Sequence, residues 1–202
     1  MGGDFADVDL EVGIRGYDVS APAKLKPGIQ LGLVLTIPLN DQMMLQPGVV
    51  FAQQGAKWED SGIQLSNLEA KYSASAKMTL NYFQFPVNFI YRYDMSSSAA
   101  LLLQAGPYLG YGLGGKEKSE YSIKAYMLSK DESDEVTINF GNNKNKHDFK
   151  AADFGMGIGA GLLFAEKFQI SLGYNLGLAD IGHYVVAKNN GIAFTMTYWL
   201  GK

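Results

Sequence analysis

The chain has no cysteine among its 202 residues, which excludes disulfide scaffolds, cysteine-based zinc sites and thiol catalysis. Its net charge is only −3, so it has no basic field that would attract nucleic acid. No apolar run approaches the ~20 residues that a membrane helix needs. With only 6 prolines, the chain also differs from disordered, proline-rich proteins.

Glycine, in contrast, is abundant, with 24 residues. The segment from Ala151 to Leu178 has two arms separated by the polar residues 165–167. Large apolar residues alternate with glycine in the first arm and with glutamine, serine, glycine and asparagine in the second. This period of two is typical of β-strands. An apolar face opposite a small or polar face favours a transmembrane barrel, because a soluble barrel turns its charged face outward.

The same alternation recurs along the chain, and the connections between the strands alternate between long and short. Short turns are expected at 38–42, 94–98 and 165–167, on the side shared by both termini, as in outer-membrane barrels. We therefore predict one domain, residues 1–202, that forms an all-β, eight-stranded, antiparallel up-and-down transmembrane barrel with long outward loops at 55–77 and 114–150. The expected strands are 5–17, 29–37, 44–54, 78–93, 99–113, 151–164, 168–178 and 191–200.

Four segments carry a family resemblance: LQPGVVFAQQGAK at 45–57, YFQFPVNFIYRY at 82–93, GPYLGYGLGG at 106–115 and FGMGIGAGLLFAEKFQISLGYNLGLADI at 154–181. They resemble the PorT-like outer-membrane β-barrel proteins. The resemblance implies a barrel in contact with outer-membrane lipid, in bacteria related to Bacteroides, where some members are linked to protein secretion to the cell surface. Because Met1-Gly2-Gly3 leads directly into an acidic segment, we expect a mature chain whose export signal has been removed.

Polar residues on the inward faces are expected to fill the barrel, since eight strands enclose just enough space for their own side chains. We interpret them as a hydrogen-bonded, salt-bridged plug in which Asp9 or Glu11 pairs with Arg92; an ion path is the alternative. The predicted interior polar cluster comprises Glu11, Arg15, Gln30, Gln46, Gln84, Asn88, Arg92, Gln104 and Tyr108.

Few residues suggest chemistry. Gly155, Gly157 and Ala160 fit a GxGxxA pattern, but no hydrophobic strand precedes it and no helix follows, as a dinucleotide site requires. Both histidines, His147 and His183, fall in expected outward loops. Asp180 with His183 is the local pair that an enzyme at the barrel rim would use, although no serine lies close in sequence. We predict no catalytic residue, no cofactor and no metal.

The connection 114–150 is the best candidate for a binding surface. Apolar residues alternate on both sides of the acidic run 131–135, which predicts a hairpin with an acidic tip above the membrane. An exposed strand edge with apolar side chains recruits protein partners. The acidic run lacks the spacing and glycine of an EF-hand calcium loop. The candidate partner-binding residues are Tyr121, Ile123, Tyr126, Asp131, Glu132, Asp134 and Glu135.

The function that the sequence favours is therefore a non-enzymatic outer-membrane protein, structural or partner-binding through its outward loops and linked to surface secretion. Two alternatives stay open. One is a soluble lipocalin-like barrel that carries an apolar ligand. The other is a membrane enzyme with its site at the barrel rim.

Overall fold

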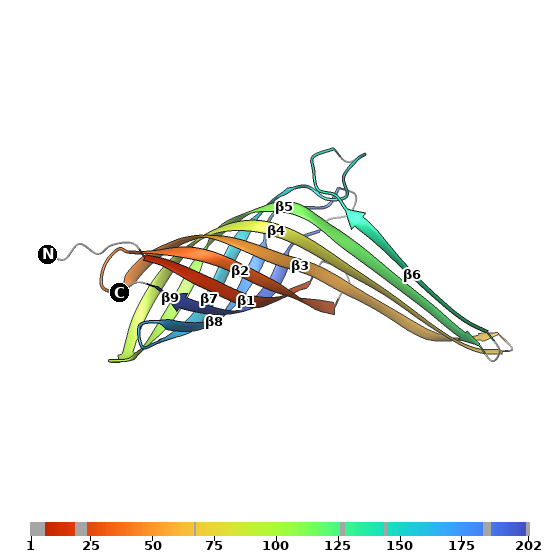
Figure 1. Ribbon diagram of the computed structural model, residues 1–202, viewed down its shortest axis with the longest axis horizontal. Helices are drawn as coiled ribbons and strands as arrows, with labels where there is room; N and C mark the ends of the chain where they lie inside the picture. Colours follow the sequence, from red (N-terminus) through yellow and green to blue (C-terminus); the bar gives the residue numbers. More distant parts are fainter. Residues whose placement is uncertain are drawn as a thin grey trace.

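The computed structural model describes residues 7–18, 24–66, 68–125, 128–143, 145–183 and 187–200 (Figure 1). Within these ranges, residues 7–18, 24–25, 60–66, 68–72, 124–125 and 128–129 are described by their backbone alone. None of the described residues belongs to a helix long and apolar enough to cross a membrane. The described chain forms nine strands: β1 (Asp7–Asp18), β2 (Lys24–Pro38), β3 (Met43–Ser66), β4 (Leu68–Ser96), β5 (Ala99–Ala125), β6 (Leu128–Ile138), β7 (Ala152–Phe164), β8 (Phe168–Gly177) and β9 (Asn190–Trp199).

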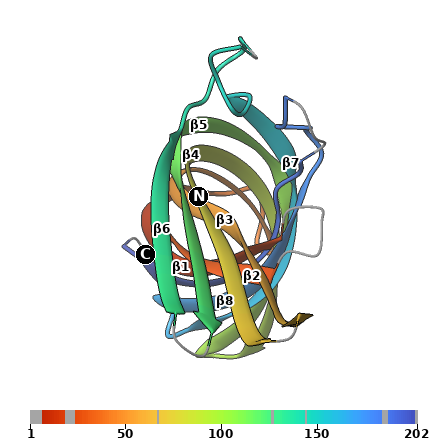
Figure 2. The ribbon, with the colours of Figure 1, turned by 90° about the vertical axis from the view of Figure 1, so that its right-hand side faces the viewer.

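Eight of these strands close into a ring, which Figure 2 shows from one end. From β1 to β5 each strand pairs with the next; β5 then pairs with β7, and the series continues to β9, which pairs with β1. All of these pairings are antiparallel. Strand β6 lies outside the ring and, in the described residues, pairs with β5 alone. The predicted eight-stranded up-and-down barrel is confirmed.

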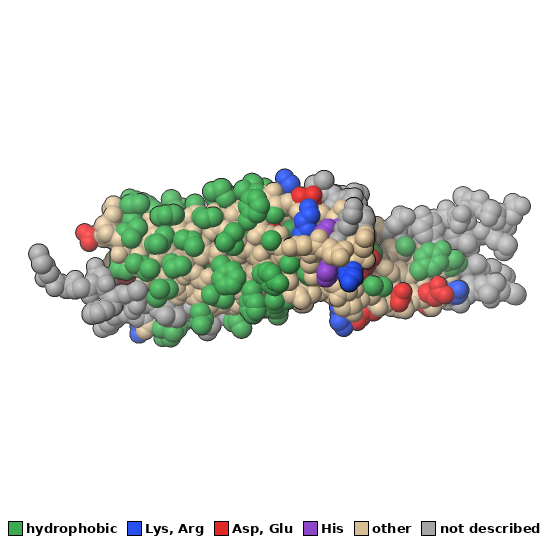
Figure 3. Space-filling model, turned by 90° about the horizontal axis from the view of Figure 1, so that it is seen from above, with side chains coloured by type: hydrophobic (Ala, Val, Ile, Leu, Met, Phe, Trp, Pro, Cys, Tyr) green, Lys and Arg blue, Asp and Glu red, His purple; other side chains and the backbone are tan. Residues whose placement is uncertain are grey.

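The period-two alternation sorts side chains to the two sides of the barrel wall. Along β7 buried and exposed residues alternate, and Phe154 and Met156 point outward with 50% and 49% exposure. Figure 3 shows hydrophobic side chains covering the barrel part of the molecule. So large an apolar surface is unfavourable in water and matches the hydrocarbon layer of a bilayer. Other members of this apolar band are Ile29, Leu31, Leu33, Val49, Phe83, Phe85, Phe89, Leu103, Leu109, Ile158, Leu172, Ile192, Phe194 and Met196.

Three tight turns, at 39–42, 97–98 and 165–167, lie at one end of the barrel, which we call the short-turn end. In the first turn Asn40 Oδ1 accepts hydrogen bonds from two backbone amides, each 2.9 Å away. In the third, Ala165 and Glu166 adopt positive φ angles of 49° and 57°. They are the central residues of a turn in which the Lys167 amide donates to the Phe164 carbonyl oxygen at 3.0 Å, and positive φ at both gives the type I′ twist that matches the flanking strands. All three turns fall where the sequence predicts them.

At the opposite end, β3 to β6 continue as a four-stranded sheet that reaches far beyond the barrel (Figure 1). Pairing between β3 and β4 persists to Ser66 and Leu68, and pairing between β5 and β6 persists to Ala125 and Leu128. We call this extension the ribbon; it comprises residues 57–66, 68–79, 114–125 and 128–138.

The ribbon differs from the sequence prediction over 55–77, where a loop is expected. The hairpin expected within 114–150 is present as the pairing of β5 with β6, which runs up to Ala125 and Leu128. The structure continues paired strands through most of both segments. Outside the membrane both faces of a sheet meet water, so the apolar alternation that marks a membrane strand is not needed there. Backbone pairing with a neighbouring strand is sufficient to hold the extended chain.

Two apolar clusters fill the barrel at its ends. At the short-turn end, the turn-end plug contains Met44, Ile90, Ala100, Leu102 and Leu163, with Trp199 packed against it. At the other end, the ribbon-end plug contains Ala56, Met78, Leu80, Tyr82, Ile138, Ala179, Ile181 and Ala187, with Trp58, Phe140 and Phe149 packed against it. The two clusters lie on either side of the polar layer described below.

Candidate functional site

Between the two plugs the barrel interior is filled by uncharged polar side chains. Gln30 Nε2 donates a hydrogen bond to Thr195 Oγ1, and Gln46 Nε2 donates one to Thr36 Oγ1, both at 3.0 Å. All four side chains are buried. Amides and hydroxyls that satisfy one another lower the cost of burying polar groups. The threonines were not among the predicted residues, although they share the inward register of the glutamines.

Four further predicted residues line a small cavity in the same layer. Gln84 and Tyr108 are buried, and Asn88 and Gln104 are half-buried. The cavity measures about 50 Å³. This space suits a few water molecules, and it is far smaller than the ~300–1,000 Å³ typical of sites that hold a small-molecule ligand. The lipocalin-like alternative is therefore wrong, because it requires an apolar interior around a ligand-sized cavity.

The charged members of the predicted interior cluster have different outcomes. The side chains of Glu11 and Arg15 lie outside the described residues; their backbones stand opposite Thr197 and Ala193 on β9. Arg92 lies at the short-turn end, with its side chain 22% exposed, and forms ion pairs with Asp94 and Glu166, each at 2.6 Å. Arg92 was expected in the barrel interior, but it lies at the rim. There it reaches the carboxylates of Asp94, near the end of β4, and of Glu166, in the turn after β7.

One buried charge was missed. Asp153, at the start of β7, is 2% exposed. Its Oδ2 accepts hydrogen bonds from Asn189 Nδ2 at 2.9 Å and from the Tyr108 hydroxyl at 3.4 Å. Asp153 lies two residues before Gly155 and therefore on the same inward face of β7. The alternation in the sequence was sufficient to predict that its side chain is buried.

The proposed catalytic pair is not assembled. His183 Nε2 lies 2.8 Å from the Gly141 carbonyl oxygen. Asp180 Oδ1 accepts the backbone amides of Gly182 and Ala187 at 3.1 and 3.0 Å, and these two bonds, with Lys150, hold the pKa of Asp180 below its ordinary value. His147 Nδ1 lies 3.1 Å from the Asn143 carbonyl oxygen. In the described part of the chain, Asp180 therefore orders its own loop.

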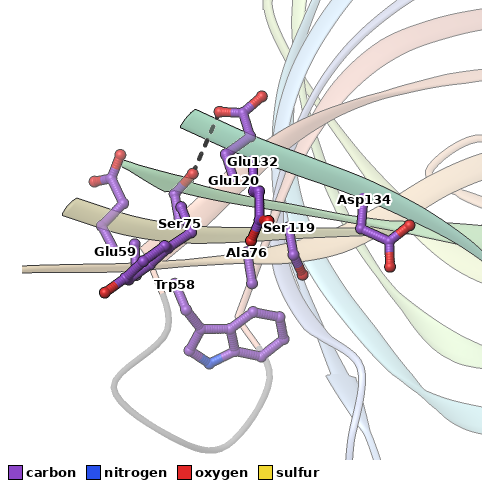
Figure 4. A pocket seen from close by; sticks show the side chains of 10 residues that line it. Trp58, Glu59, Ser75, Ala76, Ser119, Glu120, Glu132 and Asp134 are labelled. Atoms are coloured by element: carbon purple, nitrogen blue, oxygen red, sulfur yellow. Dashed lines mark hydrogen bonds between the residues drawn. The ribbon is translucent and has the colours of Figure 1, made fainter. Parts of the chain in front are cut away.

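The ribbon carries a groove of about 670 Å³, and most of its lining lies on the face that continues the barrel interior, with Glu59, Ser75 and Glu120 added from the other face. Cross-strand pairing places Trp58, Ala76, Ser119 and Asp134 in one row. In Figure 4 the Trp58 indole lies on the opposite side of the strands from the hydrogen bond between Ser75 and Glu120. Trp58 also packs against the ribbon-end plug, which fixes one end of the groove. Ala74, Tyr121 and Glu132 form the next row outward.

The predicted partner-binding residues lie on this ribbon. Tyr121 is 42% exposed and Ile123 is half-buried, while Tyr126 lies outside the described residues. The predicted acidic tip is wrong: residues 131–135 lie within β6, and the hairpin turns between Ala125 and Leu128. This register brings Glu135 opposite Lys118 and within 2.7 Å of the Lys116 ammonium, so that unlike charges oppose each other.

The acidic side chains do not converge on one point. Since successive residues of a strand point to opposite faces, Glu132 and Asp134 share the groove face and Asp131 and Glu135 share the other. Among the described residues, no group of three or more histidine, aspartate or glutamate side chains is arranged to hold a metal ion.

Comparison with known proteins identifies the type of barrel. The model of the outer membrane protein beta-barrel domain matches residues 5–182. No curated protein matches the chain. Among solved structures, Ail, the attachment invasion locus protein of Yersinia pestis, is 14% identical with a TM-score of 0.41, over 96% of each chain. Neisserial surface protein A is 12% identical with a TM-score of 0.40, over 96% of this chain and 99% of that one. The outer membrane enzyme PagL is 14% identical with a TM-score of 0.39, over 95% and 99%.

Proposed function

Because the chain belongs to the outer membrane protein beta-barrel domain family and its barrel lies in the outer membrane, we propose that it is a non-enzymatic binding protein that presents the ribbon to a partner at the cell surface. Barrels of this membrane place short turns and both termini in the periplasm and long connections outside. The ribbon then extends from the extracellular side. The groove beside Trp58, which lies on this ribbon, is the observation that carries the proposal.

The filled interior supports binding over transport. Among the described side chains, apolar plugs at both ends and a polar layer with a cavity of only about 50 Å³ between them support a filled interior. A channel of this width would need its side chains to move, since an eight-stranded barrel is narrow.

The absence of an enzymatic role is part of the proposal. An acyl- or peptide-transfer site needs a base within hydrogen-bond reach of a nucleophile, with a third group to orient it. His183 instead contacts a backbone carbonyl, and the Asp180 carboxylate accepts backbone amides.

The groove favours a partner segment with both apolar and basic side chains. Trp58, Ala76 and Tyr121 provide an apolar floor, and Glu132 and Asp134 provide negative charge beside it. An extended basic segment would satisfy both features, because aromatic anchors supply contact area and opposite charges steer the encounter.

A peptide selection tests this proposal. Random displayed peptides are selected on the detergent-solubilised protein, on Ala76→Trp, which fills the groove, and on Thr137→Trp, which adds the same kind of bulk at an exposed ribbon position outside the groove lining. We expect lysine- or arginine-containing amphipathic peptides on the parent protein and on Thr137→Trp, and at least tenfold weaker binding to Ala76→Trp. Peptides that bind all three proteins equally, or no enriched peptide at all, would contradict the proposal.

We further propose that the protein is PorT-like and serves secretion to the cell surface. The segments YFQFPVNFIYRY at 82–93 and GPYLGYGLGG at 106–115 support this relationship. Deleting the gene and measuring surface-exported proteins by cell fractionation tests it; unchanged export would argue for binding without a secretion role.

A further inference from the structure

A second cavity lies on the outer face of the wall, immediately beyond the apolar band. It measures about 550 Å³, and its lining includes four lysines, Lys26, Lys77, Lys116 and Lys118, and one glutamate, Glu135. Phe51 and Leu113 form its apolar border. Charged side chains gather at this end of the hydrophobic surface in Figure 3.

The pairing register gives the depth of this cavity. Along β4 and β5, the last aromatic pair of the apolar band is Phe83 with Tyr111. Thr79 and Lys116 pair a few residues further out, and Lys77 and Lys118 follow. At ~3.3 Å per residue the lysines begin roughly 10–15 Å along the tilted strand from the band, which corresponds to the headgroup region.

The cavity depends on a specific arrangement of the backbone. Lys26 comes from β2, yet its ammonium group donates a hydrogen bond to Thr79 Oγ1 on β4. Its side chain crosses β3 over Gly55, where an added Cβ would lie only 3.2 Å from Lys26 Cδ. The same Cβ would lie 2.0 Å from the Met78 carbonyl oxygen, so the close pairing of β3 with β4 already requires glycine here, and the Lys26 side chain passes over it.

Positive charge exceeds negative charge in this cavity. Lys116 pairs with Glu135 at 2.7 Å. The Glu120 carboxylate forms ion pairs with two lysines, with the Lys118 ammonium at 2.7 Å and the Lys77 ammonium at 3.8 Å. Within the described residues, Lys26 has the neutral Thr79 hydroxyl as its polar partner and no carboxylate.

We propose that this lysine cavity binds the phosphate group of a lipid in the outer leaflet of the outer membrane, with Phe51 and Leu113 contacting its acyl chains. Lysine ammonium groups bind phosphate as point charges, and cations at the membrane surface attract anionic lipid. A lipid satisfies the charge and the apolar border together, whereas free phosphate satisfies the charge alone. This site is separate from the groove beside Trp58, and it does not depend on the partner proposed there.

Binding of lipid A to the purified detergent-solubilised protein tests this site. Diphosphoryl lipid A, its dephosphorylated form and inorganic phosphate serve as three separate probes, and retention is measured by native mass spectrometry. We expect the double variant Lys26→Gln/Lys77→Gln to bind diphosphoryl lipid A about tenfold more weakly than the parent protein, and binding to weaken with salt. The matched control, Lys130→Gln/Lys146→Gln, removes two exposed extracellular lysines elsewhere and should bind like the parent protein.

Folding of each variant is checked by its faster migration in SDS without boiling, and Lys116→Gln replaces the double variant if that fails to fold. Equal affinity for lipid A with and without its phosphates would overturn the proposal. Unchanged binding by the folded lysine variant would do the same. Displacement of lipid A by millimolar inorganic phosphate would assign the cavity to free phosphate instead.

Discussion

Arg92 and Glu166 form a two-pronged ion pair that joins β4 to the turn between β7 and β8. Arg92 Nη1 and Nη2 each lie 2.6 Å from a carboxylate oxygen of Glu166, and Arg92 Nε lies 2.6 Å from Asp94. Strand β5 runs between the two partners in the sheet. The contact therefore ties the end of β4 to the turn between β7 and β8, where Glu166 has a positive φ angle that a glutamate rarely adopts.

Replacing Arg92 with methionine should lower the free energy of unfolding by about 1 kcal/mol. The loss is modest because the two side chains are 22% and 54% exposed, so that water screens the pair. Urea unfolding in detergent micelles measures it, with Lys167→Met as an exposed control. In a double-mutant cycle with Glu166→Gln, additive losses would mean that the two residues do not stabilise each other.

The two neighbouring leucines Leu102 and Leu103 should respond differently to truncation. Leu102 is fully buried in the turn-end plug, whereas Leu103 is 47% exposed on the apolar band. Leu102→Ala should cost about 2–4 kcal/mol of unfolding free energy, because it removes packing and leaves a cavity. Leu103→Ala should cost less than about 1 kcal/mol in the same detergent, since its contacts are with detergent chains. Equal losses in urea unfolding would contradict the inward and outward assignment.

Alanine should be tolerated unequally along the glycine rows of β7 and β8. At Gly155 an added Cβ would meet the Leu176 carbonyl oxygen at 2.3 Å and the Tyr108 ring at 2.6 Å. At Gly173 the nearest atom, the Ile158 carbonyl oxygen, is 3.2 Å away. Gly155→Ala should therefore destabilise the barrel by about 1–3 kcal/mol or more, and Gly173→Ala by clearly less. The fraction of each variant that migrates faster in SDS without boiling measures how much of it stays folded. A more stable Gly155→Ala than Gly173→Ala would refute the packing described.

The loop after β8 should loosen in acid because of Asp180. Its pKa lies below the ordinary value, chiefly because the amides of Ala187 and Gly182 donate to the carboxylate. A carboxyl group with a lowered folded-state pKa stabilises the fold above the unfolded-state value of about 3.9, and this contribution is lost as pH falls through the folded-state pKa.

Pepsin cleavage within residues 180–190, followed from about pH 5 down to about pH 2, tests this expectation. The parent protein should become more susceptible as the pH falls. Asp180→Asn, whose amide oxygen still accepts both backbone bonds, should show a weaker dependence. Identical pH profiles for the two proteins would show that another group controls the loop.

Sequence reasoning was strongest where each residue's position relative to lipid determines its type. The rows of Phe154 and Met156 against Gly155 and Gly157 predict strand, face and membrane together, and the structure agrees on each. The inward glutamines Gln30 and Gln46 follow from the same period.

It was weakest where contacts depend on strands distant in sequence. Nothing near Arg92 in the sequence indicates Glu166, 74 residues away, and the register alone brings them together. The same holds for Lys26, which reaches Thr79 across the intervening strand β3.

The sequence by itself determined that eight strands cross the membrane and which face of each meets lipid, because the bilayer imposes a residue-by-residue alternation that is visible in one chain. Tertiary structure decided that the connection at 55–77 continues as paired strands, and that the hairpin expected within 114–150 joins them in one four-stranded ribbon. In water both faces of that ribbon accept polar residues, so the register of its four strands is set mainly by the pairing of β3 with β4, β4 with β5 and β5 with β6. The groove and the lysine cavity both arise from that pairing.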